Sequence, residues 1–166
     1  LDGLADTADA YVGGGSDRAR ILAILKDPRC GPMGVVAIGL VLLGKHALLA
    51  ALLAHDAYAP LVLAPVLGRA ALLGWLLVLP PARPGGLAAA VAVALPHRRG
   101  RVLLAVLALA ILLAGGAYAL LAGGLVAGLW GRHQHTRLGG CTGDTLGAGC
   151  ELVETATLLS ALIALA

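Results

Sequence analysis

The sequence predicts an all-α fold, a polytopic bundle of transmembrane helices with an acidic, glycine-rich candidate active site at its cytoplasmic face. Hydrophobic residues make up 60% of the chain and charged residues only 13%, whereas charged residues form about a quarter of an ordinary soluble domain. Phe is absent and the chain contains 24 glycines. Small residues let helices approach each other closely in a bilayer, so we expect residues 1–166 to form a single integral membrane domain.

The first predicted element is an acidic helix at the start of the N-terminal motif, residues 1–32. Asp2, Asp6 and Asp9 are spaced i, i+4 and i+7, which places their carboxylates on one face of a helix. Like charges on one face repel each other, whereas Mg²⁺ prefers oxygen ligands. The face therefore predicts a magnesium site, with a solvated acidic surface as the alternative. The sequence begins with Leu1, inside this motif, and no charged leader precedes the motif. We therefore expect an N-terminal segment to be missing.

A short amphipathic helix is expected after the glycines at 13–15. Ser16 is a suitable N-cap for a helix over residues 17–26. Its apolar side chains can face the bilayer, while basic side chains stay at the interface and can reach phosphates. These basic residues are Arg18, Arg20, Lys26 and Arg29. The prolines at 28 and 32 then break the helix.

Two membrane spans follow, at residues 33–54 and 58–79. At about 1.5 Å per residue, each is long enough to cross roughly 30 Å of hydrocarbon. Lys45 and Arg69 lie inside these spans, where a charged side chain that faces lipid is costly. We expect both to face the bundle interior. Two interpretations stay open: the side chains snorkel or pair with a carboxylate of a neighbouring helix, or they bind a ligand.

Residues 82–101 are predicted to form a cytoplasmic loop with a re-entrant or interfacial helix. The apolar run at 88–95 is too short to span the bilayer. The run at 97–101 contains three arginines and marks a surface cluster.

Residues 102–130 are apolar throughout, and their length suits either one tilted helix or a hairpin that turns at Gly115 and Gly116. The hairpin places the basic clusters at 18–29, 83–101 and 132–137 on the same side of the membrane. By the positive-inside rule this is the cytoplasmic side, so we favour the hairpin.

The last segment, residues 138–166, joins a glycine-rich acidic motif to the final membrane helix. Asp144 and Glu151 are seven residues apart and share one helix face, and Glu154 lies one turn further. Acidic side chains in a membrane helix are costly. The pattern therefore predicts a polar site at this end of the chain.

Two acidic helices with arginines between them are suited to bind Mg²⁺ and an anionic diphosphate. Phosphoryl transfer uses such groups, because carboxylates hold the metal and cations stabilise the leaving group. Other chemistry is less well supported: the three cysteines form no CxxC pair, and the glycines form no P-loop or dinucleotide-binding motif. The basic residues are not interleaved with aromatic residues, which argues against nucleic-acid binding.

Four motifs occur in order along the chain: LDGLADTAD at 1–9, ILKDPR at 24–29, ARPGGL at 82–87 and LGGCTGDTLGAGCE at 138–151. Together they closely resemble the cobalamin synthase family, the adenosylcobinamide-GDP ribazoletransferases. The resemblance implies a multi-pass transferase of phosphorus-containing groups in the bacterial inner membrane, acting in the last steps of cobalamin biosynthesis. It implies that the ribose hydroxyl of α-ribazole, or of its 5′-phosphate, attacks adenosylcobinamide-GDP and releases GMP.

The same resemblance implies roles for individual residues. It makes Asp2, Asp6 and Asp9 the ligands of a Mg²⁺ cofactor. Further catalytic residues implied by it are Lys26, Asp27 and Asp144, and further binding residues are Arg20, Arg29, Arg137 and Glu151. The implied partners are the two substrates and the lipid bilayer, with a second copy of the chain or other pathway enzymes in addition.

Two other classes of membrane protein stay open. A CDP-alcohol phosphotransferase also uses an aspartate cluster that contains an Asp-Gly pair, but that pattern has an Arg where this chain has Asp6. A non-enzymatic transporter subunit would use Lys45 and Arg69 in a permeation path. Residues 102–130 supply almost no polar groups for such a path.

Overall fold

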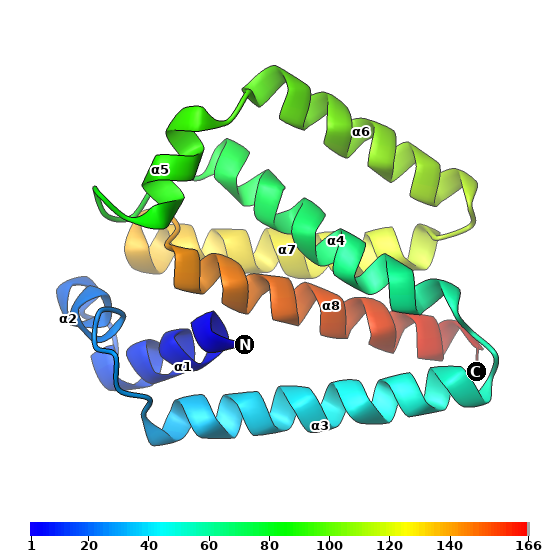
Figure 1. Cartoon of the computed structure of the whole chain (residues 1–166), viewed down its shortest axis with the longest axis horizontal. Coiled ribbons are helices and arrows are strands. Elements are labelled where there is room, and N and C mark those ends of the chain that lie inside the picture. The colour runs from blue at the N-terminus through cyan, green and yellow to red at the C-terminus, as the bar shows by residue number, and fades with distance from the viewer. Residues whose placement is uncertain (166) are drawn as a thin grey trace.

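The structure, a computed structural model, describes residues 1–165. This part of the chain contains eight helices joined by turns and loops (Figure 1). In chain order they are α1 (Asp2–Gly14), α2 (Arg18–Ile24), α3 (Pro32–Ala54), α4 (Ala59–Val78), α5 (Leu87–Ala94), α6 (His97–Leu113), α7 (Ala117–Leu138) and α8 (Gly143–Leu165). No β-strand occurs within residues 1–165. The all-α class predicted from composition is therefore confirmed.

The last helix, α8, is the central helix of the bundle and contacts α1, α3, α4 and α7. Several of its buried residues are small, among them Ala148, Gly149 and Cys150. At Gly149 the indole rings of Trp75 and Trp130 lie so close that an added Cβ would collide with both. Small residues thus allow the close helix packing that the composition predicts.

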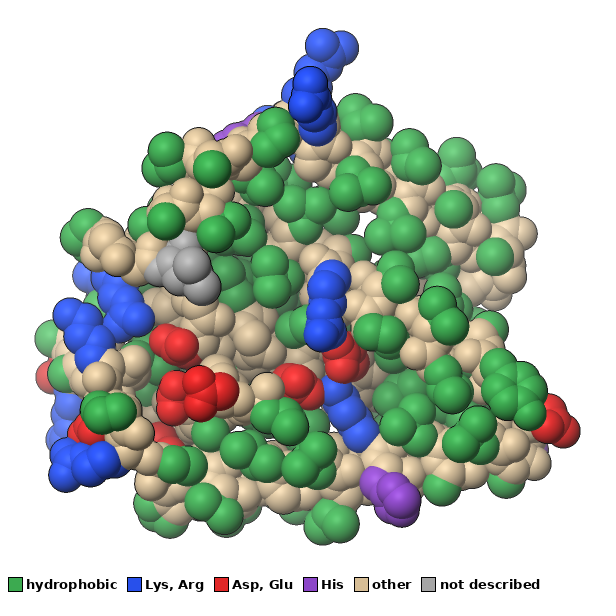
Figure 2. Space-filling view, in the orientation of Figure 1, with side chains coloured by type: hydrophobic (Ala, Val, Ile, Leu, Met, Phe, Trp, Pro, Cys, Tyr) green, Lys and Arg blue, Asp and Glu red, His purple; other side chains and the backbone are tan. Residues whose placement is uncertain are grey.

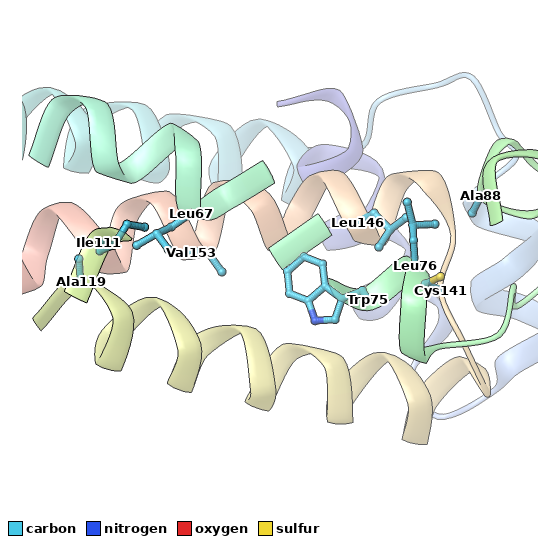
Figure 3. Close-up of a cluster of buried hydrophobic side chains, with 9 residues drawn as sticks. All are labelled: Leu67, Trp75, Leu76, Ala88, Ile111, Ala119, Cys141, Leu146 and Val153. Atoms are coloured by element: carbon cyan, nitrogen blue, oxygen red, sulfur yellow. The ribbon is translucent and has the colours of Figure 1, made fainter. Parts of the chain in front are cut away.

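The main hydrophobic core lies between α4, α7 and α8, with contributions from α5 and α6 (Figure 3). Leu67 and Trp75 of α4 pack with Val153 of α8. The indole Nε1 of Trp75 donates a hydrogen bond to the carbonyl oxygen of Ala127 at 2.9 Å, so the polar tip of this buried ring is satisfied. A separate cluster around Ile21 and Leu138 holds α1 and α2 against the end of α7.

Three helices are long and apolar enough to cross a membrane: α3, α4 and α8. The ends of α3 and α4 lie within one residue of the predicted spans at 33–54 and 58–79. Long apolar runs bounded by proline and short polar turns are the clearest signals in a sequence of this kind.

The helices α6 and α7 run antiparallel and are joined by a tight turn at residues 114–116 (Figure 1). Gly115 has a φ of 80° in this turn, a conformation that glycine adopts without steric cost. The apolar stretch at 102–130 is thus divided between two helices, as the hairpin requires, and a single tilted helix is excluded.

The second helix differs from its prediction in both its cap and its length. Asp17, not Ser16, is the N-cap of α2: its Oδ1 accepts hydrogen bonds from the backbone N–H groups of Ala19 at 2.8 Å and Arg20 at 3.2 Å. Aspartate caps a helix about as well as serine, and the sequence offers both. The helix ends at Ile24, two residues before the predicted end.

Candidate functional site

Two helices from opposite ends of the chain bring carboxylates together at one end of the bundle. Asp2 and Asp6 belong to α1, and Asp144 lies in the first turn of α8. The helices meet at Gly3, where an added Cβ would lie 2.6 Å from the backbone oxygen of Asp144. Only glycine permits this approach. The acidic side chains of this region form a red group over α1 in Figure 2.

A cavity of about 280 Å³ opens beside these carboxylates and is lined by Asp2, Gly3, Arg83, Thr142 and Asp144, among others. Arg83 Nη2 lies 3.7 Å from Asp144 Oδ2. Asp144 Oδ2 and Arg83 Nη1 are both buried and have no hydrogen-bond partner among the described residues. A buried polar atom without a partner is costly, so these groups are suited to receive a polar ligand.

Arg83 was not among the residues that the sequence assigned to the site. Its segment is fixed by backbone hydrogen bonds to the turn before α8: Ala82 N–H donates to the Cys141 oxygen at 2.8 Å, and Cys141 N–H donates to the Pro80 oxygen at 2.9 Å. The only signal for Arg83 is its place in the ARPGGL motif.

Arg18 reinforces this junction. Its guanidinium donates to the carbonyl oxygen of Leu138 at 2.8 Å and to that of Ala82 at 3.0 Å. One side chain of α2 therefore holds the Arg83 segment and the end of α7 together. The sequence predicted Arg18 as a phosphate-facing residue, but in the structure it donates to backbone oxygens.

The electrostatic environment of Asp6 is unfavourable for a negative charge. Partial burial raises the pKa of its carboxyl group, and the negative charges of Asp2, Asp144 and Asp9 raise this pKa further. A bound cation would reverse this effect, because it favours the ionised carboxylates. The arrangement thus matches the predicted acidic face of α1 and adds Asp144 to it.

The carboxylates fit a magnesium ion by their chemistry, since Mg²⁺ takes hard oxygen ligands. Among residues 1–165, no three His, Cys, Asp or Glu side chains are grouped so as to hold a metal ion by themselves. Mg²⁺ usually binds one or two carboxylates together with water and substrate phosphates. One or two of these acidic side chains, together with water and phosphate oxygens, would therefore be sufficient.

Asp9 has a structural contact that its spacing does not reveal. Its Oδ2 accepts a hydrogen bond from Gly31 N–H at 2.7 Å, and its Oδ1 accepts one from Gly34 N–H at 2.9 Å. These amides lie at the start of α3, where the helix dipole favours a negative charge. Asp9 thus anchors α3 to α1, and its assignment as a magnesium ligand stays a prediction.

The start of α8 is held rigidly beside the cavity. Thr142 N–H donates to Thr145 Oγ1 at 2.9 Å, and Thr145 N–H donates to Thr142 Oγ1 at 3.2 Å. Trp130 Nε1 donates to the Thr145 carbonyl oxygen at 2.8 Å. These contacts fix the first turn of α8, and with it Asp144.

The other basic and acidic residues predicted near the diphosphate lie outside the cavity lining. Asp27 and Arg29 pair with each other through a 2.6 Å contact in the turn after α2, and these hydrogen bonds lower the pKa of Asp27 to about 2. Arg20 and Lys26 are exposed nearby. Arg137 donates to the carbonyl oxygen of Gly15 and lies 5.7 Å from the centre of the Tyr11 ring.

Glu151 pairs with Lys45 within the bundle. Lys45 Nζ lies 2.6 Å from Glu151 Oε2 and 2.6 Å from Glu154 Oε2, and Arg69 also pairs with Glu154. The residues come from α3, α4 and α8 and neutralise one another. Of the two interpretations of Lys45 and Arg69, the structure favours pairing with carboxylates of a neighbouring helix.

Comparisons with known proteins agree on one family. The family model described as cobalamin-5-phosphate synthase matches residues 1–163. A relative from Pseudomonas putida (strain GB-1) is 51% identical over 160 residues, which cover 96% of this chain and 66% of the relative. A relative from Pseudomonas syringae pv. syringae (strain B728a) is 53% identical over 163 residues, which cover 96% of this chain and 67% of the relative. Both are named adenosylcobinamide-GDP ribazoletransferase.

A third relative with this name, from Stutzerimonas stutzeri (strain A1501), is 50% identical over 161 residues. The chain spans about two thirds of the length of these relatives, 66% in the case of the S. stutzeri protein. No solved structure matches the chain.

Proposed function

The chain belongs to the cobalamin-5-phosphate synthase family, and on that basis we propose that the protein is an adenosylcobinamide-GDP ribazoletransferase. The ribose hydroxyl of α-ribazole, or of its 5′-phosphate, attacks the phosphorus bound to the cobinamide side of adenosylcobinamide-GDP. The bond from this phosphorus to GMP breaks, and the hydroxyl proton passes to a carboxylate or to water. The products are adenosylcobalamin, or its 5′-phosphate, and GMP.

The observation that carries the proposal is the meeting of α1 and α8 beside Arg83. One or two of the carboxylates of Asp2, Asp6 and Asp144 would hold Mg²⁺ there together with substrate phosphates, with Asp9 on the same helix as Asp2 and Asp6. When bound, the metal supplies positive charge to the phosphate oxygens. The buried Oδ2 of Asp144, which has no hydrogen-bond partner among the described residues, and the raised pKa of Asp6 support this assignment.

The basic residues of the site neutralise the diphosphate. Arg83 lines the cavity and would contact a phosphate of the bound substrate. The exposed basic side chains on α2 and in the turn after it add positive charge that would attract an anionic substrate. These residues are Arg20, Lys26 and Arg29.

The membrane location belongs to the same proposal. Three helices can span a bilayer, and we propose a multi-pass protein of the bacterial inner membrane whose acidic end faces the cytoplasm. The basic residues near that end favour this orientation.

The test is turnover of adenosylcobinamide-GDP and α-ribazole by the purified protein in detergent or nanodiscs, with GMP release as the readout. Activity is expected to require Mg²⁺ and to fall at least about a thousandfold in Asp6→Asn. Asp56→Asn is a matched control, because Asp56 is an exposed aspartate in the turn between α3 and α4. A folded protein that releases no GMP with any divalent metal would overturn the proposal.

A further inference from the structure

The first turn of α6 carries three arginines that face solvent or lipid. Arg98, Arg99 and Arg101 are all exposed, and none of them takes part in an ion pair within residues 1–165. Basic side chains project above the first turns of α6 in Figure 2, away from the acidic group over α1. This patch is therefore separate from the candidate active site.

A shallow, open groove on the outer surface of α6 includes two of these arginines. It has a volume of about 520 Å³ and is lined by Arg98, Arg99, Val102, Leu103 and Val106. Positions 98 and 102, and 99 and 103, are four residues apart on the helix, so each arginine lies one turn above an apolar side chain. The groove thus has a cationic end and an apolar floor.

The remaining outer surface of α6 is apolar. Leu109, Leu112 and Leu113 continue the exposed apolar row begun by Val102 and Val106. This row runs along the helix away from the arginines, as a lipid chain would run from its headgroup into the bilayer.

The backbone at the start of α6 adds further positive potential. Pro96 is the N-cap, and no side chain caps this end of the helix. The free N–H groups and the helix dipole therefore favour a negative charge close to the arginines. Two independent features, the arginine side chains and the uncapped helix end, favour an anion at the same place.

We propose that this groove binds one anionic phospholipid, with its phosphate on Arg98 and Arg99 and an acyl chain along Val102, Leu103 and Val106. A free phosphate or a nucleotide would use the arginines but would leave the apolar floor uncovered. A zwitterionic lipid would cover the floor but would offer less negative charge. An anionic phospholipid is complementary to both parts.

Native mass spectrometry of the full chain with equal amounts of phosphatidylglycerol and phosphatidylcholine tests this site. We expect at least one phosphatidylglycerol to be retained, and its affinity to fall about tenfold or more in the variant R98Q/R99Q/R101Q. The variant V102S/V106S keeps the arginines and is expected to lose affinity as well. The variant R98K/R99K/R101K keeps the charges and is expected to retain most of the binding.

Single substitutions provide the matched control. Arg132 is an exposed arginine on α7 that takes part in no ion pair of the described chain, so Arg132→Gln is compared with Arg99→Gln. Equal losses in these two variants, or no preference for phosphatidylglycerol, would overturn the proposal. Complete displacement of the lipid by glycerol phosphate would also overturn the proposal, because the site would then recognise the phosphate group alone. Circular dichroism verifies that each variant is folded.

Discussion

Asp9 ties α1 to the start of α3 through hydrogen bonds to two backbone N–H groups. Asp9→Ala is expected to destabilise the protein by about 2 kcal/mol, because both amides lose a charged acceptor. Thermal unfolding in detergent measures this loss. Asp17→Ala, which removes the exposed cap of α2, is the matched control and is expected to cost about 1 kcal/mol or less. Equal losses would contradict the anchoring role of Asp9.

The substitution Asp6→Asn is expected to raise the stability of the metal-free protein although it lowers the activity. Its raised pKa means that the folded protein binds a proton more tightly than the unfolded chain. Ionisation therefore disfavours folding, and stability falls as the pH rises from the ordinary aspartate value through the raised value. At pH 7 without metal, Asp6→Asn should unfold at a higher temperature than the wild type.

The added stability of Asp6→Asn should disappear at a pH below the ordinary aspartate pKa, where the wild-type carboxyl group is also neutral. Added Mg²⁺ should stabilise the wild type more than the variant. Unfolding temperatures with EDTA and with Mg²⁺ test both statements, with Asp56→Asn as the control. A variant less stable than the wild type at pH 7 in EDTA would refute this electrostatic account.

Individual site residues were predictable where one helix determines their placement. The common face of Asp2 and Asp6 follows from their spacing. The position of Arg83 depends on the backbone hydrogen bonds between Ala82 and Cys141, residues far apart in the sequence. The contact of Asp9 with α3 likewise forms between two elements, so spacing alone could not reveal it.

At the scale of elements, α8 is held between two indole rings. An added Cβ at Gly149 would collide with Trp75 and Trp130, so Gly149→Ala is expected to destabilise the protein by about 1–3 kcal/mol. Gly128 of α7 has no atom within 4 Å of an added Cβ. Gly128→Ala should therefore be neutral or stabilising by up to about 1 kcal/mol, as in an exposed helix. Thermal unfolding compares the two, and equal effects would argue against close packing at Gly149.

The ion pairs of Lys45 connect α3 to α8. Lys45→Met leaves Glu151 without a side-chain partner in the bundle, and we expect a loss of about 3 kcal/mol or more in the free energy of unfolding. The double variant Lys45→Met/Glu151→Gln removes the charge of Glu151 as well. It should recover part of the stability, as measured by denaturant unfolding. A double variant that is less stable than Lys45→Met would contradict this account.

Element boundaries were predictable to different degrees. The helices α3 and α4 follow from apolar length, and their ends match the predicted ones closely. For α2, adjacent Ser16 and Asp17 are both suitable caps, and the choice depends on how the chain leaves α1. The turn at Gly115 was one of two alternatives and is present in the structure, whereas the side of the membrane on which the basic residues lie stays a prediction.

Across the whole molecule, the candidate site lies where the first and last helices meet. Asp2 and Asp144 are at opposite ends of the chain, yet Gly3 packs directly on the backbone of Asp144. The sequence predicted two acidic motifs and one shared site, because paired acidic helices with arginines suit a metal and a diphosphate. It could not predict that Glu151 would pair with Lys45, since that depends on the position of Lys45 in the assembled bundle.

The charge network has a consequence for the order in which the membrane part assembles. Lys45 and Arg69 are made early, whereas their partner Glu154 follows 109 and 85 residues later. During synthesis, α3 and α4 therefore leave the ribosome with unmatched cations. The carboxylates that pair with them in the structure lie on α8, so these ion pairs can form only after α8 has been made. We therefore expect a chain that ends before α8 to be less stable in a bilayer, because Lys45 and Arg69 would lack these carboxylates.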